Sequence, residues 1–294
     1  AASDVYKRQS SSTAIIIFLK SMRHCLNSNS SFSAHSARKR QGNTMNLNDN
    51  QSENALQLRG KKISIFGDSI STLIGSNPKG YNLFFTGGTC QRAGVRTAED
   101  TWWGKVIGSL GGELLVNNSW SGSCVTKLPN REGLFPSGCS DERTSALHNG
   151  LQMPEVIIVY LGTNDWANGI LPRYGGEFAC GEVDWEFVFE AAYCEMLKKL
   201  KHNYPAAQIF CCTLCAAYMS QNPEFVFNEN AGGINIKEYN AAICRAAESQ
   251  NCRPIDLYKY AVPYDSIDGT HPNKGGMSTL ADLILREMLG ENNA

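Results

Sequence analysis

The sequence predicts an α/β domain built on a parallel sheet, from its size, its composition and the order of its apolar segments. The chain has 294 residues, of which 42% are hydrophobic and 19% charged, as is typical of one sizeable globular domain. From Lys61 onward, short apolar runs that fit buried strands alternate with longer amphipathic stretches that fit helices. This order indicates repeated strand-helix units, in which successive strands are parallel.

Each element of this pattern has its own local signal. The expected strands are short apolar runs that precede turn residues: Ile63–Phe66, Glu113–Asn117, Val156–Leu161, Gln208–Thr213 and Arg253–Asp256. The expected helices are the amphipathic stretches between them: Thr101–Leu110, Trp185–His202, Ile236–Gln250 and Gly275–Met288. Asp184 is placed to cap the second of these helices, and Pro205 to stop it. Residues 61–291 therefore form one predicted domain.

The first 60 residues differ from the rest of the chain. Because they are rich in serine and asparagine and have no sustained hydrophobic period, we expect residues 1–60 to be disordered or absent from the natural protein. Residues 4–9 resemble a translated sequencing adaptor, which makes Met45 a candidate true start. The apolar stretch Ala14–Leu19 is far shorter than the roughly 20 residues of a membrane span, and no cleavage pattern follows it. We therefore expect a cytoplasmic protein with no membrane segment.

Charge and cysteine content argue against several classes of protein. With 27 basic and 28 acidic residues, the net charge of −1 gives no electrostatic reason to expect nucleic acid or an anionic membrane as a partner. The 11 cysteines are odd in number and many lie in apolar or helical patterns, which favours reduced thiols. Cys212 and Cys215 have zinc-like spacing, but no matching second pair follows, so we expect core packing and no metal.

Reactive residues are expected where the strands end, because parallel α/β sheets bind ligands beyond the carboxyl ends of their strands. A serine hydroxyl becomes a nucleophile when a neutral imidazole takes its proton, and a carboxylate fixes the tautomer of that imidazole. Ser69, His271 and Asp268 fit these roles, since an aspartate three residues before a histidine can reach its Nδ1. Each motif alone has a simpler interpretation: Gly-Asp-Ser as a turn, and Asp268 as a helix cap.

Four blocks, Gly-Asp-Ser, Asn-Ser-Trp-Ser-Gly, Gly-Thr-Asn-Asp and Asp-Gly-Thr-His, occur in this order along the chain. Together they resemble the SGNH hydrolases, also called the GDSL esterase/lipase superfamily, over residues 61–291. The resemblance implies a three-layer α/β/α, flavodoxin-like fold with a five-stranded parallel sheet. It also implies a triad of Ser69, Asp268 and His271, and an oxyanion hole made by the backbone of Ser69 and Gly122 and the side chain of Asn164.

We therefore expect serine-dependent hydrolysis of carboxylic esters through an acyl-enzyme on Ser69, with no cofactor. Without a lid-like amphipathic helix, short acyl groups are favoured, including O-acetyl groups on carbohydrate. A lysophospholipase or thioesterase is the alternative within this class, and a non-catalytic ligand-binding module is the alternative outside it. Trp120 and Trp166 are candidates for lining the substrate pocket, with core packing as the alternative. Arg143 is a candidate for binding a substrate carboxylate, with surface solvation as the alternative. The sequence leaves the oligomeric state open.

Overall fold

The computed structural model of the chain describes residues 56–128, 135–173 and 184–290. The predictions for the leader, including the adaptor-like residues 4–9 and the start at Met45, lie outside the described residues.

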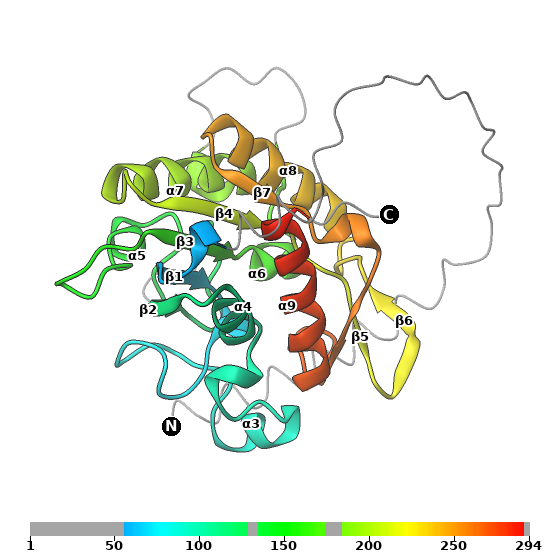
Figure 1. Ribbon diagram of the computed structural model, residues 1–294. Helices are drawn as coiled ribbons and strands as arrows, with labels where there is room; N and C mark the ends of the chain where they lie inside the picture. Colours follow the sequence, from blue (N-terminus) through cyan, green and yellow to red (C-terminus); the bar gives the residue numbers. More distant parts are fainter. Residues whose placement is uncertain (1–55, 129–134, 174–183, 291–294) are drawn as a thin grey trace, which may run out of the picture. The chain divides into compact units, whose positions relative to one another are not determined.

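A five-stranded parallel sheet forms the centre of the domain (Figure 1). It has the spatial order β2-β1-β3-β4-β7. The strands are β1 (Lys62–Gly67), β2 (Glu113–Ser119), β3 (Val156–Tyr160), β4 (Gln208–Cys212) and β7 (Arg253–Ile255). All five residues of the central strand β3 are buried, as a parallel strand covered on both faces requires. The five predicted strands are confirmed, each within two residues of its predicted bounds.

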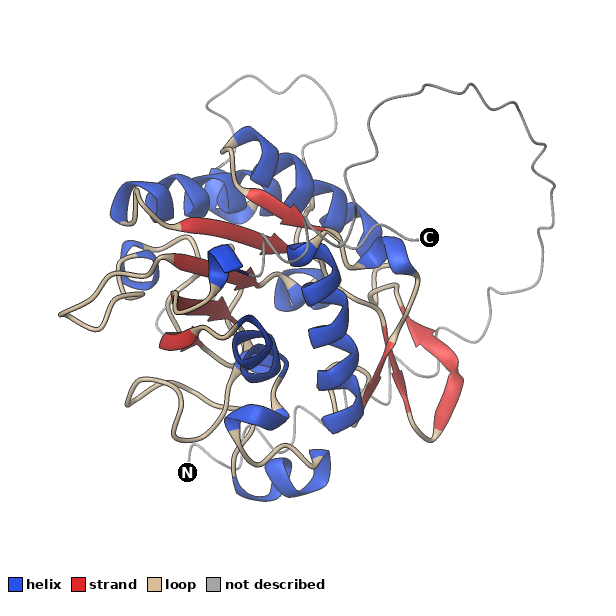
Figure 2. Ribbon diagram, viewed as in Figure 1, coloured by secondary structure: helices blue, strands red, loops and turns tan. Residues whose placement is uncertain are grey.

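Helices pack on both faces of the sheet and complete three layers (Figure 2). One pair is α4 (Trp102–Leu110) with α9 (Lys274–Leu289), and the other is α7 (Phe189–Asn203) with α8 (Ile236–Ser249). The predicted helix that starts at Trp185 is interrupted: a 3₁₀ turn, η4 (Trp185–Phe187), precedes α7. Asp184 caps that turn, because its side chain accepts the backbone N–H of Glu186. The predicted three-layer α/β/α fold is confirmed.

The sequence pattern did not reveal the shorter elements. They include the helices α3 (Gly87–Ala93), α5 (Asp141–Thr144) and α6 (Thr163–Ala167), the 3₁₀ turns η2 (Ser69–Ser71), η3 (Ala98–Asp100) and η5 (Tyr258–Tyr260), and a second sheet of order β6-β5-β8. Its strands are β5 (Ala217–Met219), β6 (Asn222–Phe227) and β8 (Tyr264–Ser266). Since β8 is parallel to β5 and ends two residues before Asp268, this small sheet positions the loop from Asp268 to His271.

The remaining chemical expectations concern cysteines, metals and membranes. Cys212 on β4 and Cys215 just after it are buried free thiols. Over the ranges that the structure describes, no group of histidine, cysteine and acidic side chains is arranged to hold a metal ion. No helix within the described part of the chain has the length and apolar character needed to traverse a bilayer.

Candidate active site

Ser69 lies at the carboxyl edge of the central sheet because the chain turns sharply after β1. Asp68 caps the 3₁₀ turn η2, with its Oδ1 accepting the backbone N–H of Ile70 at 3.0 Å. Gly67, the last residue of β1, has no room for a side chain: a Cβ there would lie 2.7 Å from Ser71 Oγ. After Ser69 the chain makes only this single 3₁₀ turn.

The three predicted triad residues form one continuous chain of hydrogen bonds. Nε2 of His271 lies 2.9 Å from Oγ of Ser69, although the two residues are 202 positions apart. Nδ1 of His271 lies 2.8 Å from Oδ2 of Asp268, whose Oδ1 also accepts the backbone N–H of His271 at 2.8 Å. Ser69 is buried and the His271 side chain is 17% exposed. This arrangement allows the imidazole to remove the hydroxyl proton of Ser69.

The electrostatics of Asp268 keep it ionised. Burial by itself raises the pKa of the Asp268 carboxyl, but the hydrogen bond and positive charge of His271 and two backbone N–H groups outweigh burial, so its pKa lies below the ordinary value. An ionised Asp268 accepts the Nδ1 proton and leaves Nε2 free to accept from Ser69.

An aromatic ring that the sequence did not single out covers the face of the His271 imidazole. The rings of Phe84 and His271 are stacked, with centroids 3.4 Å apart and planes 5° apart. The backbone N–H of Phe84 donates to Thr72 Oγ1 at 3.0 Å, and that hydroxyl donates to the carbonyl oxygen of Ser69 at 3.0 Å. Phe84 therefore links the segment of the nucleophile to the segment of the base. No periodicity or motif around Phe84 marks this role in the sequence.

The predicted oxyanion donors Ser69, Gly122 and Asn164 lie in the segments that follow β1, β2 and β3. Gly122 has a φ of +84°, in the region that favours glycine. Asn164 is in α6, and one of its side-chain N–H groups donates to the carbonyl oxygen of Ser123 at 3.0 Å, which leaves the other available. Within the described ranges, the backbone N–H groups of Ser69 and Gly122 donate to no protein acceptor. Three N–H donors are therefore free to bind a ligand oxygen.

Two buried carboxyl groups, Asp68 and Asp165, flank these donors, and both accept hydrogen bonds. Asp165 accepts from the backbone N–H groups of Val125 (2.8 Å) and Thr126 (3.0 Å), and so holds the loop after β2 against α6. Burial raises the pKa of Asp165 to about 6, although these hydrogen bonds oppose the rise. Burial likewise raises the pKa of Asp68 to about 6, although the Ile70 N–H and the charge of His271 oppose it.

The prediction that Arg143 binds substrate is wrong, and so is its alternative of surface solvation. Arg143 lies in α5 and is completely buried. Its guanidinium donates to Asn118 Oδ1 (2.7 Å), Ser123 Oγ (2.7 Å), and the carbonyl oxygens of Asn118 (3.0 Å), Gly67 (3.1 Å) and Pro136 (3.4 Å). Burial lowers the pKa of Arg143 to about 10, so the group remains a cation at neutral pH. The sequence could not show that these acceptors converge on one point in the core.

The two tryptophans differ in their surroundings. Trp166 is 8% exposed and its indole N–H donates to the carbonyl oxygen of Ile234 at 3.1 Å, which supports the packing alternative. Trp120 is half-buried against Tyr81, with ring centroids 4.4 Å apart, and its indole nitrogen has no hydrogen-bond partner among the described residues. A substrate contact by Trp120 stays a prediction.

Comparisons with known proteins show the family and the fold. Residues 61–288 match the family model described as GDSL-like lipase/acylhydrolase. A protein assigned as a GDSL-like lipase from Bacteroides ovatus is similar in structure, at 23% identity and a TM-score of 0.58, covering 76% of this chain and 96% of that one. A second, from Bacteroides uniformis, has 27% identity and a TM-score of 0.56, covering 76% and 93%.

A carbohydrate acetylesterase from Sinorhizobium meliloti shares the fold at 16% identity and a TM-score of 0.51, covering 79% of this chain and all of that one (100%). No curated protein is significantly similar in sequence. The family match spans nearly all of the α/β domain. The chain therefore belongs to the GDSL-like lipase/acylhydrolase family and is a hydrolase that acts on ester bonds.

Proposed function

We propose that this hydrolase removes short acyl groups, with O-acetyl groups on carbohydrate as the favoured class, through an acyl-enzyme on Ser69. The observation that supports a serine mechanism is the unbroken chain from Ser69 Oγ through His271 to Asp268, with distances of 2.9 and 2.8 Å. No step of this chemistry needs a metal or an organic cofactor.

The proposed reaction has two halves that use the same groups. Ser69 Oγ attacks the ester carbonyl carbon while Nε2 of His271 takes the hydroxyl proton, and the carbonyl oxygen becomes negative. The N–H groups of Ser69, Gly122 and Asn164 stabilise that oxygen. When the intermediate collapses, His271 gives its proton to the departing alcohol, and an acyl-Ser69 ester is left. Water then attacks this ester with His271 again as base, which releases the acid and restores Ser69.

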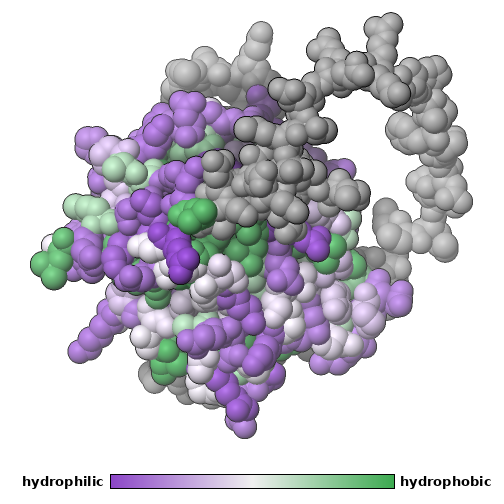
Figure 3. Space-filling model, in the orientation of Figure 1, coloured by the Kyte–Doolittle hydropathy of each residue, from purple (hydrophilic) through white to green (hydrophobic). Residues whose placement is uncertain are grey.

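The preference for short acyl groups is supported by the surface. On the face seen in Figure 3, hydrophobic residues occur in small groups among hydrophilic ones. An enzyme that works on aggregated lipid needs a broad apolar contact surface instead. The acetylesterase from Sinorhizobium meliloti shows that this fold can act on acetylated carbohydrate.

The deciding experiment is a substrate panel measured on wild type and Ser69→Ala. We expect wild type to hydrolyse p-nitrophenyl acetate and acetylated oligosaccharides, with kcat/KM falling as the acyl chain lengthens. Ser69→Ala should lose about 10⁶ in turnover while its circular dichroism spectrum stays unchanged. A folded Ser69→Ala protein with full activity would refute the serine mechanism. A preference for long-chain lysophospholipids or thioesters would replace the proposed substrate class. Failure of wild type to react with a fluorophosphonate would instead favour a non-catalytic binding module.

A further inference from the structure

A single buried guanidinium connects the segments that hold the oxyanion donors. An arginine side chain has five N–H groups, and Arg143 makes five hydrogen bonds, the one to Pro136 being long at 3.4 Å. Its acceptors come from the end of β1 (Gly67), the end of β2 (Asn118) and the loop after β2 (Ser123). Because the guanidinium is planar and rigid, these contacts fix the three segments relative to one another.

Two of the three tethered segments are adjacent to a donor of the oxyanion hole. Gly67 precedes Ser69 by two residues, and Ser123 directly follows Gly122. The carbonyl oxygen of Ser123 in turn accepts the side-chain N–H of Asn164 at 3.0 Å. One side chain therefore sets the spacing of all three donors, directly for two of them and through Ser123 for the third.

The cost of burying this cation indicates that it does more than pack. Moving an unpaired charge into the interior is unfavourable, and among the described residues no carboxylate lies within ion-pair distance (4.0 Å) of Arg143. Carbonyl and hydroxyl oxygens solvate the charge instead. An apolar residue of similar size would fill the same space at lower cost, but the side-chain acceptors Asn118 Oδ1 and Ser123 Oγ would lose their guanidinium donor.

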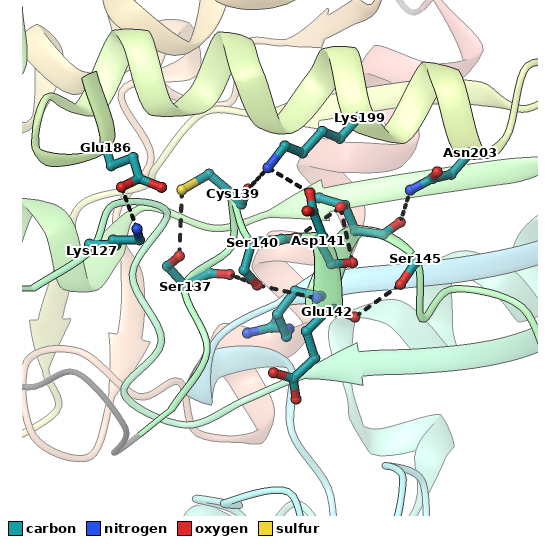
Figure 4. Close-up of polar contacts among 12 residues, drawn as sticks. Lys127, Ser137, Cys139, Ser140, Asp141, Glu142, Ser145, Glu186, Lys199 and Asn203 are labelled. Atoms are coloured by element: carbon teal, nitrogen blue, oxygen red, sulfur yellow. Dashed lines mark hydrogen bonds and ion pairs between the residues drawn. The ribbon is translucent and has the colours of Figure 1, made fainter. Parts of the chain in front are cut away.

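The short helix α5 that bears Arg143 is itself held firmly in place. Ser140 caps it by accepting the backbone N–H of Arg143 at 3.2 Å. Figure 4 shows Lys199 and Asn203 of α7 reaching across to this helix. Lys199 Nζ lies 2.8 Å from Asp141 Oδ1, and Asn203 donates to the carbonyl oxygen of Thr144 at 3.1 Å. The position of the guanidinium is thus determined by α7 as well as by its own acceptors.

We propose that Arg143 is the positioning residue of the oxyanion hole: its guanidinium holds the donors of Ser69, Gly122 and Asn164 at the spacing that a tetrahedral oxyanion needs. This role rests on the proposed esterase function. It acts through other residues, since a completely buried Arg143 contacts no substrate. Misplaced donors weaken transition-state binding more than ground-state binding, so the loss appears in kcat.

The test uses two variants that weaken the tether in different ways. Ser123→Ala removes one hydroxyl acceptor, and we expect kcat to fall about 10-fold with KM within about twofold. Arg143→Lys keeps the charge but loses the planar fork, and we expect a fall of about 100-fold. The inhibition constant of an alkyl boronic acid, which forms a tetrahedral adduct on a serine, should weaken in parallel with kcat/KM.

The matched control is Arg245→Lys. Arg245 makes a two-bond contact with Glu190 between α8 and α7 (3.1 and 2.7 Å), and this variant should keep wild-type kcat and boronic acid affinity. Wild-type kcat and boronic acid affinity in folded Ser123→Ala would overturn the inference, as would an activity loss that only tracks the melting temperature. If Arg143→Lys does not fold, Ser123→Ala decides alone. A Ser69→Ala protein that keeps activity would overturn the esterase mechanism itself.

Discussion

At the scale of single residues, the two hydrogen bonds of His271 lie in the plane of its ring and leave the tilt of that plane unrestrained. Phe84 supplies the missing restraint by stacking on the imidazole face at 3.4 Å. On the proposed mechanism, the same aromatic face would attract the imidazolium that forms when Ser69 gives up its proton. The orientation of the imidazole and the stabilisation of its positive charge would therefore both depend on Phe84, although Phe84 takes no part in the proton transfer.

Replacing Phe84 by leucine should lower kcat about 10-fold and leave KM nearly unchanged, because the cation and its orientation matter only in the reaction itself. Steady-state kinetics on a p-nitrophenyl ester measures both constants. Phe84→Tyr should recover most of the rate, since tyrosine offers the same ring face. Phe225→Leu, an exposed aromatic on β6, is the matched control and should behave as wild type. A rise in KM with unchanged kcat would make Phe84 a substrate contact instead.

Asn164→Ala should lower kcat by roughly 10² to 10³ and change KM only a few-fold, because a side-chain donor to the oxyanion acts mainly when that oxygen becomes negative. The same side chain also bonds the carbonyl oxygen of Ser123, so a purely structural role has to be separated. Measuring kcat, KM and Tm on one preparation does this. A large fall in Tm with activity loss in proportion, or an unchanged kcat, would remove Asn164 from the mechanism.

Sequence motifs predicted only those site residues whose roles are indicated by the residue types around them. Ser69, Asp268 and His271 lie in short blocks whose residue types already specify a nucleophile, a carboxylate and a base. Phe84 is placed by a tertiary contact with a residue 187 positions later, and no local pattern encodes that contact. The prediction for Arg143 was wrong because its charge suggested a surface position, whereas the side chain is buried with acceptors that lie in the core.

At the scale of elements, the strength of the hydrophobic pattern determined which strands and helices could be predicted from the sequence. The fully buried run of β3 is easily recognised in the sequence, whereas β2 and β7 are buried only toward their carboxyl ends and were recognised as apolar segments that precede turn residues. Strand β6 is nowhere fully buried, and β5 and β8 have three residues each, so no alternation could develop. The four-residue helix α5 is likewise too short for a helical period. The elements that the sequence did not reveal include the small sheet, which positions the loop from Asp268 to His271, and α5, which bears Arg143.

At the scale of the whole molecule, two buried carboxyl groups give stability an unusual dependence on pH. The pKa values of Asp68 and Asp165 are raised from 3.8 to about 6 by burial, so the folded protein binds these protons more tightly than the unfolded chain. Their effect is to lower the free energy of unfolding as pH rises from about 4 to about 6. In the opposite direction, Asp100, paired with Lys274, has a pKa lowered to about 2, and its contribution is lost as pH falls below about 4.

We therefore expect Tm to be higher at pH 5 than at pH 7.5, as measured by differential scanning calorimetry in buffers of matched ionic strength. The difference should shrink in Asp68→Asn, which removes one of the two titrating carboxyl groups. Glu113→Gln, at an exposed position of β2, should leave it unchanged. A Tm that climbs steadily from pH 5 to pH 7.5 would show that Asp68 and Asp165 do not dominate this range.

The long separation between Ser69 and His271 in the sequence also determines when, during synthesis, the proposed active site can form. During synthesis the nucleophile emerges near the beginning of the domain, and its base follows 202 residues later, just before α9. On the proposed mechanism, a nascent or truncated chain that stops anywhere between them holds a serine with no imidazole to take its proton. Ester hydrolysis by this route would begin only once the last strand of the small sheet and the first strand of the large one have both formed and brought the two residues together. Measurable ester hydrolysis would therefore report that synthesis and folding of the α/β domain are complete.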